Sequence, residues 1–134
     1  MYVDSLFPGS DEYYAGNIKY SDARKKGEKL YDLFLSKDRF YSCAYWKSDD
    51  ETLEQAQQNK VDHIIKKLGN IKPGSRVIDL GCGWGGMAFE LAKQKGCEVT
   101  GISLSKNQID YCKRKAKELG LITHFSQSLP YQHY

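Results

Sequence analysis

The sequence lacks the paired cysteine spacings that are typical of metal sites and disulfide frameworks. It contains four cysteines, Cys43, Cys82, Cys97 and Cys112, and none of them forms a Cys-x-x-Cys pair. Neither a zinc site nor a disulfide framework is therefore indicated. Free thiols in a reducing compartment are the better interpretation.

Long apolar runs and a strong net charge are also missing. No N-terminal run resembles a signal peptide, and no run of about 18 apolar residues predicts a membrane span, so we expect a cytoplasmic protein. The formal net charge of +3 is too small to indicate nucleic acid as a partner. It permits a weak attraction to an anionic membrane surface, where each basic residue contributes about 1 kcal/mol.

Hydrophobic periodicity and turn residues predict an alternation of helices and strands after residue 23. Two capping boxes, Ser48-x-x-Glu51 and Thr52-x-x-Gln55, compete for the start of the second helix. The expected elements are helices over residues 23–35, 48–67, 84–95 and 105–119, and strands over residues 76–80, 98–102 and 121–125.

This order predicts a right-handed α/β unit with a parallel sheet, which is about half of a doubly wound fold. The chain then ends in SQSLPYQHY with no further helix. A parallel sheet is normally covered on both faces, so one face is expected to lack its cover. Either the chain is a fragment, or a partner such as a second copy in a homodimer supplies the missing half.

Glycines are concentrated in the stretch VIDLGCGWGG, residues 77–86. An apolar strand that runs into four glycines predicts a sharp turn and the start of a helix, where backbone N–H groups face a nucleotide-like ligand. The pattern Gly-x-Gly-x-x-Gly at Gly81, Gly83 and Gly86 is also that of dinucleotide sites. Such sites require an acid about 20 residues on, and residues 102–104 are Ile-Ser-Leu.

The pattern Asp-x-Gly-x-Gly-x-Gly, from Asp79 to Gly85, favours a different cofactor. A carboxylate two residues before the first glycine can receive the ammonium of a methionine-like tail, whereas it would repel a pyrophosphate. S-adenosylmethionine is therefore the better cofactor, although an Asp that merely caps the turn remains open.

Several motifs together resemble one family. YSCAYW (41–46), TLEQAQQNK (52–60), PG (73–74), VIDLGCGWGG (77–86) and VTGISLSKNQ (99–108) have the order and spacing of the cyclopropane-fatty-acyl-phospholipid synthases and the mycolic acid cyclopropane synthases. The resemblance covers about residues 30–122. Two segments depart from the family pattern: residues 23–25, where members usually carry His-Tyr-Asp, and residues 126–134.

The resemblance implies a Rossmann-like methyltransferase fold and assigns the site residues. Cys43 matches a catalytic cysteine that helps hold bicarbonate, the general base of the family. The residues that match S-adenosylmethionine contacts are Tyr41, Ser42, Asp79, Gly81, Cys82, Gly83, Trp84, Gly85, Ser103, Leu104 and Gln108. A hydroxyl at Ser103, in place of a strand-end acid, is usual for this family.

The implied activity is S-adenosylmethionine-dependent methyl or methylene transfer to double bonds of unsaturated phospholipid acyl chains, with peripheral association at the membrane. We expect an N-terminal arm and helical cap with the YSCAYW loop over residues 1–47, and a partial methyltransferase domain over residues 48–134. Two alternatives stay open: a coclaurine-type N-methyltransferase of small molecules, and a non-catalytic S-adenosylmethionine-binding remnant.

Overall fold

The structure, a computed structural model, describes residues 29–128. The chain divides into two compact units, Met1–Phe34 and Leu35–Tyr134. Of the helix expected over residues 23–35, residues 29–32 are helical and residues 23–28 lie outside the described residues. Residues 35–47 belong to the same unit as the sheet, and the domain division at residue 47 stays a prediction.

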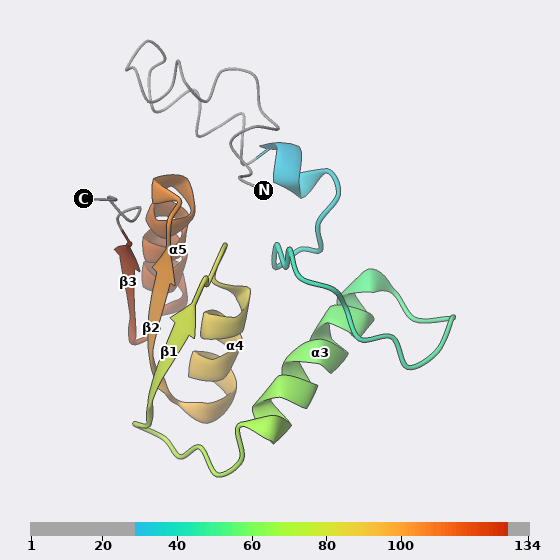
Figure 1. The fold of residues 1–134 in the computed structure, drawn as a ribbon, viewed down its shortest axis with the longest axis horizontal. Helices are drawn as coiled ribbons and strands as arrows, with labels where there is room; N and C mark the ends of the chain where they lie inside the picture. The colour runs from blue at the N-terminus through green and yellow to red at the C-terminus, as the bar shows by residue number, and fades with distance from the viewer. Residues whose placement is uncertain (1–28, 129–134) are drawn as a thin grey trace, which may run out of the picture. The chain divides into compact units, whose positions relative to one another are not determined.

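The second unit is built on three parallel strands, β1 (Arg76–Leu80), β2 (Glu98–Ser103) and β3 (Thr123–Gln127), in the order β1-β2-β3. The connections run through α4 (Gly86–Lys95) and α5 (Lys106–Leu119), and α3 (Leu53–Lys67) precedes the sheet (Figure 1). Asp79 pairs with Gly101, which in turn pairs with Phe125. The predicted half of a doubly wound, Rossmann-like parallel sheet is thus confirmed.

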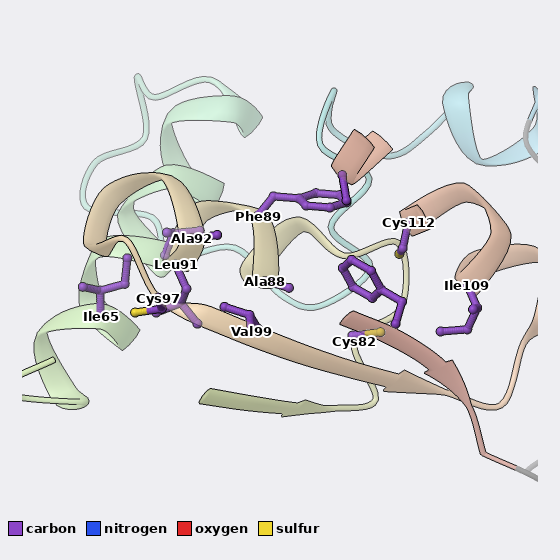
Figure 2. Close-up of a cluster of buried hydrophobic side chains, with 13 residues drawn as sticks. Ile65, Cys82, Ala88, Phe89, Leu91, Ala92, Cys97, Val99, Ile109 and Cys112 are labelled. Atoms are coloured by element: carbon purple, nitrogen blue, oxygen red, sulfur yellow. The ribbon is translucent and has the colours of Figure 1, made fainter. Parts of the chain in front are cut away.

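The hydrophobic core lies between the helices and one face of this sheet (Figure 2). Val99 of β2 and Cys112 of α5 are fully buried, and the rings of Phe89 and Phe125 meet edge to face at 5.6 Å. On β1 the side chains alternate, so that Ile78 and Leu80 point to the opposite face and are 65% and 78% exposed. No helix within residues 29–128 buries them, as the sequence predicted for one sheet face.

The starts of three elements, α3, α4 and β3, differ from the predicted ones by two residues or more. Strand β2 ends one residue later and β3 two residues later than predicted, and α5 begins one residue later. Helix α3 begins at Leu53 and not at residue 48, because the reciprocal capping box forms at Thr52: the Gln55 amide donates to Thr52 Oγ1 at 3.3 Å, and the Thr52 amide donates to Gln55 Oε1 at 2.7 Å. Helix α4 begins at Gly86, two residues later than predicted, since the glycine turn extends to Gly85.

Strand β3 begins at Thr123 and not at residue 121. The Leu121 amide donates to the Ala116 carbonyl at 3.0 Å, so Leu121 is held by the C-terminal cap of α5 and not by the sheet. None of the helices in the described part of the chain is both long and apolar enough to cross a bilayer.

Candidate cofactor site

The glycine turn, residues 81–85, follows β1 at the carboxyl edge of the sheet. The amides of Gly81 and Cys82 both donate to the Ile102 carbonyl, at 2.9 and 3.0 Å, which ties the turn to the end of β2. Gly81 and Gly83 have φ angles of +78° and +54°, and a Cβ placed on either would meet no atom within 4 Å. Glycine therefore permits the left-handed backbone and leaves open space above it, in which a ligand can approach.

Asp79 lies two residues before this turn, half-buried near the end of β1. Its Oδ2 atom is buried and accepts no hydrogen bond from residues 29–128. Burial raises the pKa of the Asp79 carboxyl above its usual value, because no donor compensates the lost hydration. A ligand that brings an ammonium or a hydroxyl would satisfy this acceptor.

Helix α4 starts at the end of the turn without a side-chain cap: Gly85 occupies the N-cap position and provides no side-chain hydrogen bond. The amides of a first helical turn carry partial positive charge and donate hydrogen bonds to ligands. The turn thus combines an unpartnered carboxylate with open backbone donors. This combination fits a cofactor that carries both an amino acid and hydroxyl groups.

The carboxyl end of β2 gathers the second group of predicted cofactor residues. Ser103 Oγ donates to Gln108 Oε1 at 2.7 Å and accepts from the Ser105 amide at 3.2 Å. The Gln108 side chain is thereby held at Ser103. The backbone amide of Gln108 donates to Ser105 Oγ at 3.4 Å. Leu104 is exposed, and its carbonyl accepts from Gln127 Nε2 at 2.9 Å. The structure brings Ser103, Leu104 and Gln108 together.

The predicted residues of the 41–46 loop (YSCAYW) lie exposed, and neighbouring contacts connect the loop to the turn. Tyr41 is 63% exposed, and Ser42 and Cys43 are exposed as well. A Cβ placed on Gly86 would lie 2.8 Å from the Phe40 ring, so the residue before the loop packs on the first residue of α4, next to the glycine turn. The two parts of the predicted site are therefore neighbours.

The side chains of Cys82 and Trp84 point into the protein and not into open space. Cys82 belongs to the hydrophobic core, where the neighbouring Cys112 thiol lowers the pKa of Cys82 and the pKa of Cys112 is raised in turn. The Trp84 ring meets Tyr111 edge to face at 5.3 Å, and the Arg39 guanidinium lies 4.9 Å from the Trp84 ring centroid. A cofactor role for these two residues rests on their backbone and stays a prediction.

Two residues of α3 that the sequence did not single out hold the 41–46 loop. Gln57 Nε2 donates to the Ser42 carbonyl at 3.2 Å, and Lys60 Nζ donates to Ser42 Oγ at 2.9 Å. Their spacing of three residues places them on one side of a helix, within the TLEQAQQNK motif. Within residues 29–128 no group of three metal-ligating side chains is present.

Solved structures that align with this chain include a cyclopropane synthase and an N-methyltransferase. The structure of mycolic acid cyclopropane synthase CmaA1 with SAH and CTAB aligns with a TM-score of 0.69 and 33% identity, over 80% of this chain and 38% of that one. Coclaurine N-methyltransferase bound to N-methylheliamine and SAH aligns with a TM-score of 0.72 and 25% identity, over 79% and 32%. The fold is that of an S-adenosylmethionine-dependent methyltransferase.

Residues 16–134 match the family described as mycolic acid cyclopropane synthetase, and the chain belongs to this family. A probable fatty acid methyltransferase of Pseudomonas putida is 45% identical over 92 residues, which are 69% of this chain and 23% of the relative. The cyclopropane-fatty-acyl-phospholipid synthase of Escherichia coli K12 is 42% identical over 100 residues, or 75% and 23%. The chain thus spans about a quarter of the length of these two relatives.

The family match over residues 16–134 is longer than the predicted resemblance over residues 30–122, and it includes both segments, 23–25 and 126–134, that were predicted to depart from the family pattern. The first of these, residues 23–25, lies outside the described residues.

Proposed function

We propose that this chain forms the cofactor-binding part of an enzyme that transfers a methyl or methylene group to double bonds in the acyl chains of membrane phospholipids. The observation that carries the proposal is the meeting of three features at one edge of the sheet: the open glycine turn, the unpartnered Asp79 carboxylate and the exposed 41–46 loop. The names of the fatty acid methyltransferase and of the phospholipid synthase support the lipid acceptor.

Each residue group has a role in this proposal. Asp79 accepts from the ammonium of the methionyl group, directly or through water, and Gly81 and Gly83 leave room for the cofactor along the backbone. Ser103 and Gln108 present polar atoms to the ribose and methionyl groups, and Tyr41 and Ser42 meet the methionyl end. S-adenosylmethionine would supply an electrophilic methyl group on its sulfonium.

Cys43 completes the proposed site at the acceptor side. It is a free thiol on the exposed 41–46 loop, and in this proposal it contributes one contact to a bicarbonate ion. A weak base held close to the reacting carbon suits proton removal in an apolar pocket. A cytoplasmic enzyme that works peripherally at the membrane belongs to the same proposal, because the acceptor double bonds lie in the bilayer; a homodimer stays a prediction.

Calorimetry with S-adenosylhomocysteine tests the cofactor part of the proposal. We expect wild-type protein to bind the ligand and Asp79→Ala to bind it at least about tenfold more weakly, since a charge-assisted hydrogen bond contributes about 1.5–3 kcal/mol. Unchanged affinity in the variant would refute the assignment of the Asp79 site.

Transfer of a labelled methyl group tests the acceptor. Labelled S-adenosylmethionine is supplied with vesicles of dioleoyl phosphatidylcholine or, as a control, of saturated dipalmitoyl phosphatidylcholine. We expect label in the unsaturated lipid alone, together with a dependence on added bicarbonate.

The similarity to coclaurine N-methyltransferase favours a second candidate, methyl transfer to a small amine. In that case the label enters an amine such as a tetrahydroisoquinoline, the vesicles stay unlabelled and bicarbonate has no effect. Cofactor binding without any transfer supports the third candidate, a non-catalytic binding module.

A further inference from the structure

Lys60 of α3 is a buried ammonium to which the proposed function gives no role. It is 8% exposed, and its Nζ donates to Ser42 Oγ at 2.9 Å and to Gln57 Oε1 at 2.6 Å. The ammonium also lies 3.8 Å from the centroid of the Phe40 ring. Within residues 29–128, no ion pair joins Lys60 to a carboxylate. A buried cation beside the 41–46 loop therefore lacks an anion among these residues.

The hydrogen bond from Lys60 makes Ser42 Oγ an acceptor on the side of α3. A lysine ammonium has three hydrogens and no acceptor, so Ser42 Oγ must accept from it. The Ser42 hydroxyl hydrogen is then available to a different acceptor, and Ser42 is exposed. The 41–46 loop thus presents an O–H donor that is polarised by the ammonium behind it.

Gln57 makes this arrangement more rigid. Its Oε1 atom accepts from Lys60 Nζ, and its Nε2 atom donates to the Ser42 carbonyl at 3.2 Å. Both the backbone and the side chain of Ser42 are therefore held by α3. The Tyr45 amide adds a third attachment, since it donates to the Ala56 carbonyl at 3.0 Å. The position of Ser42 Oγ is therefore held by α3 before any ligand binds.

The neighbouring Cys43 adds to the case for an anion. Burial lowers the pKa of Lys60 to about 8, and negative charge on the Cys43 thiol acts in the opposite direction and raises it. Lys60 and Cys43 are thus close enough for electrostatic coupling. An anion bound beside both residues would restore the charge balance that burial removes.

We propose that Lys60 is a positioning residue that holds the Ser42 hydroxyl as a donor toward a carboxylate-type oxyanion bound at Ser42 and Cys43, and that its ammonium balances the charge of this oxyanion. The inference rests on the proposed function. Two ligands share this chemistry: the methionyl carboxylate of the cofactor and the bicarbonate ion. Both are planar oxyanions that accept from O–H and N–H donors.

Calorimetry with two adenosine ligands and with bicarbonate distinguishes these sources. S-adenosylhomocysteine carries the carboxylate, whereas 5′-methylthioadenosine lacks the whole amino acid group. If the oxyanion is the methionyl carboxylate, Lys60→Met weakens S-adenosylhomocysteine about 10- to 100-fold and leaves 5′-methylthioadenosine unchanged. If it is bicarbonate, only the bicarbonate titration, run against chloride at equal ionic strength, loses its saturable heat.

A merely structural role for Lys60 is separated by matched variants. Lys60→Arg retains a buried donor and a positive charge, so it should recover most of the lost affinity. The effects of Lys60→Met and Ser42→Ala should be non-additive in the double variant, because Lys60 acts through Ser42. Lys66→Met, on an exposed position of the same helix, is the control and should change neither ligand. Additive effects, or equal loss of both adenosine ligands, would contradict the proposal.

A measurement on wild-type protein keeps this inference independent of cofactor binding and of how well Lys60→Met folds. The side-chain Nζ resonance of Lys60 is followed by NMR while sodium acetate, a carboxylate probe, replaces sodium chloride. A saturable shift supports the oxyanion site even if no adenosine ligand binds. Failure of the adenosine ligands to bind would contradict only the proposed function. No shift with acetate or bicarbonate, and unchanged ligand binding in Lys60→Met, overturns the inference.

Discussion

The Phe40 ring lies against Gly86 so closely that a Cβ at residue 86 would come within 2.8 Å of it. The Asp38 carbonyl would be 3.1 Å from the same atom. This contact joins the segment before the 41–46 loop to the first residue of α4. The relative position of the loop and the glycine turn therefore depends on the absence of one methyl group.

We predict that Gly86→Ala destabilises the protein. Alanine favours a helix over glycine by about 1 kcal/mol, but forcing the methyl group against Phe40 costs about 1–3 kcal/mol, and the clash is expected to prevail. Urea unfolding measures the net change. The double variant Gly86→Ala with Phe40→Leu should recover part of the loss, since leucine leaves more room; equal stability of the single variant and wild type would show that Phe40 moves away freely.

The start of α3 gives a second prediction, because two capping boxes compete in the sequence. Thr52→Ala should lower the free energy of unfolding by about 1 kcal/mol, since it removes the acceptor for the Gln55 amide. The matched control is Ser48→Ala, which should stay within about 0.5 kcal/mol of wild type because α3 does not begin there. If thermal unfolding showed a larger loss of stability for Ser48→Ala than for Thr52→Ala, the helix would begin at the Ser48 capping box and the prediction would be wrong.

Local sequence was sufficient where a boundary is set by nearby residues. Strand β1 lies at residues 76–80 as predicted, because Pro73 and Gly74 precede the apolar run and Gly81 ends it. The predicted start of α3 was wrong, because both capping boxes satisfy the same local pattern. Glu51 lies outside the helix, where it accepts from the Lys47 amide and from Asn59 Nδ2, each at 2.8 Å. The contact with Asn59 spans eight residues and is not visible as a local pattern.

The contacts of the candidate site likewise divide into local ones, which the sequence predicts, and distant ones, which it does not. Ser103 and Gln108 are five residues apart, and the motif placed them together. The roles of Gln57 and Lys60 could not be predicted from the sequence, because their contacts with Ser42 span 15 and 18 residues and require the folded chain. The sequence also could not show that the Trp84 side chain is buried, since a glycine-rich pattern describes the backbone and leaves side-chain directions open.

Asp79→Asn is predicted to separate stability from cofactor affinity. The Asp79 carboxyl is partly desolvated without a donor, and its pKa is raised. Neutralising it should therefore stabilise the ligand-free protein by about 0.5–2 kcal/mol while S-adenosylhomocysteine binds about 10- to 100-fold more weakly. Thermal unfolding and calorimetry on the same samples measure both changes. Asp110→Asn, which removes an exposed ion pair with Lys106, is the control and should change stability by less than about 1 kcal/mol.

The pH dependence of stability should also show that the charged form of Asp79 destabilises the folded chain. Because the folded pKa of Asp79 lies above the ordinary value of 3.8, the folded chain binds more protons than the unfolded chain between these two pKa values. The contribution of Asp79 to stability should therefore decline as the pH rises through this window, and Asp79→Asn should remove that decline. Parallel pH profiles of wild type and variant would argue against an unpartnered Asp79 carboxylate.

The lowered pKa of Lys60 leads to opposite trends in affinity and stability above neutral pH. The free protein loses the Lys60 charge as the pH rises through about 8, so affinity for a carboxylate ligand should fall by up to about tenfold per pH unit. Over the window from about 8 to the ordinary value of 10.5, the unfolded chain binds more protons, and the contribution of Lys60 to stability should rise with pH. Calorimetry and urea unfolding across this window measure the two trends.

Two variants isolate Lys60 from the other groups that titrate there. Lys60→Arg stays charged throughout, so it should retain only the pH dependence of the ligand amino group. Cys43→Ser removes the neighbouring thiol, whose negative form raises the Lys60 pKa, and should shift the fall in affinity to lower pH. Identical pH profiles for wild type and Lys60→Arg would mean that the Lys60 charge does not reach the ligand. In that case the hydroxyl of Ser42, and not the ammonium behind it, sets the preference for an anion.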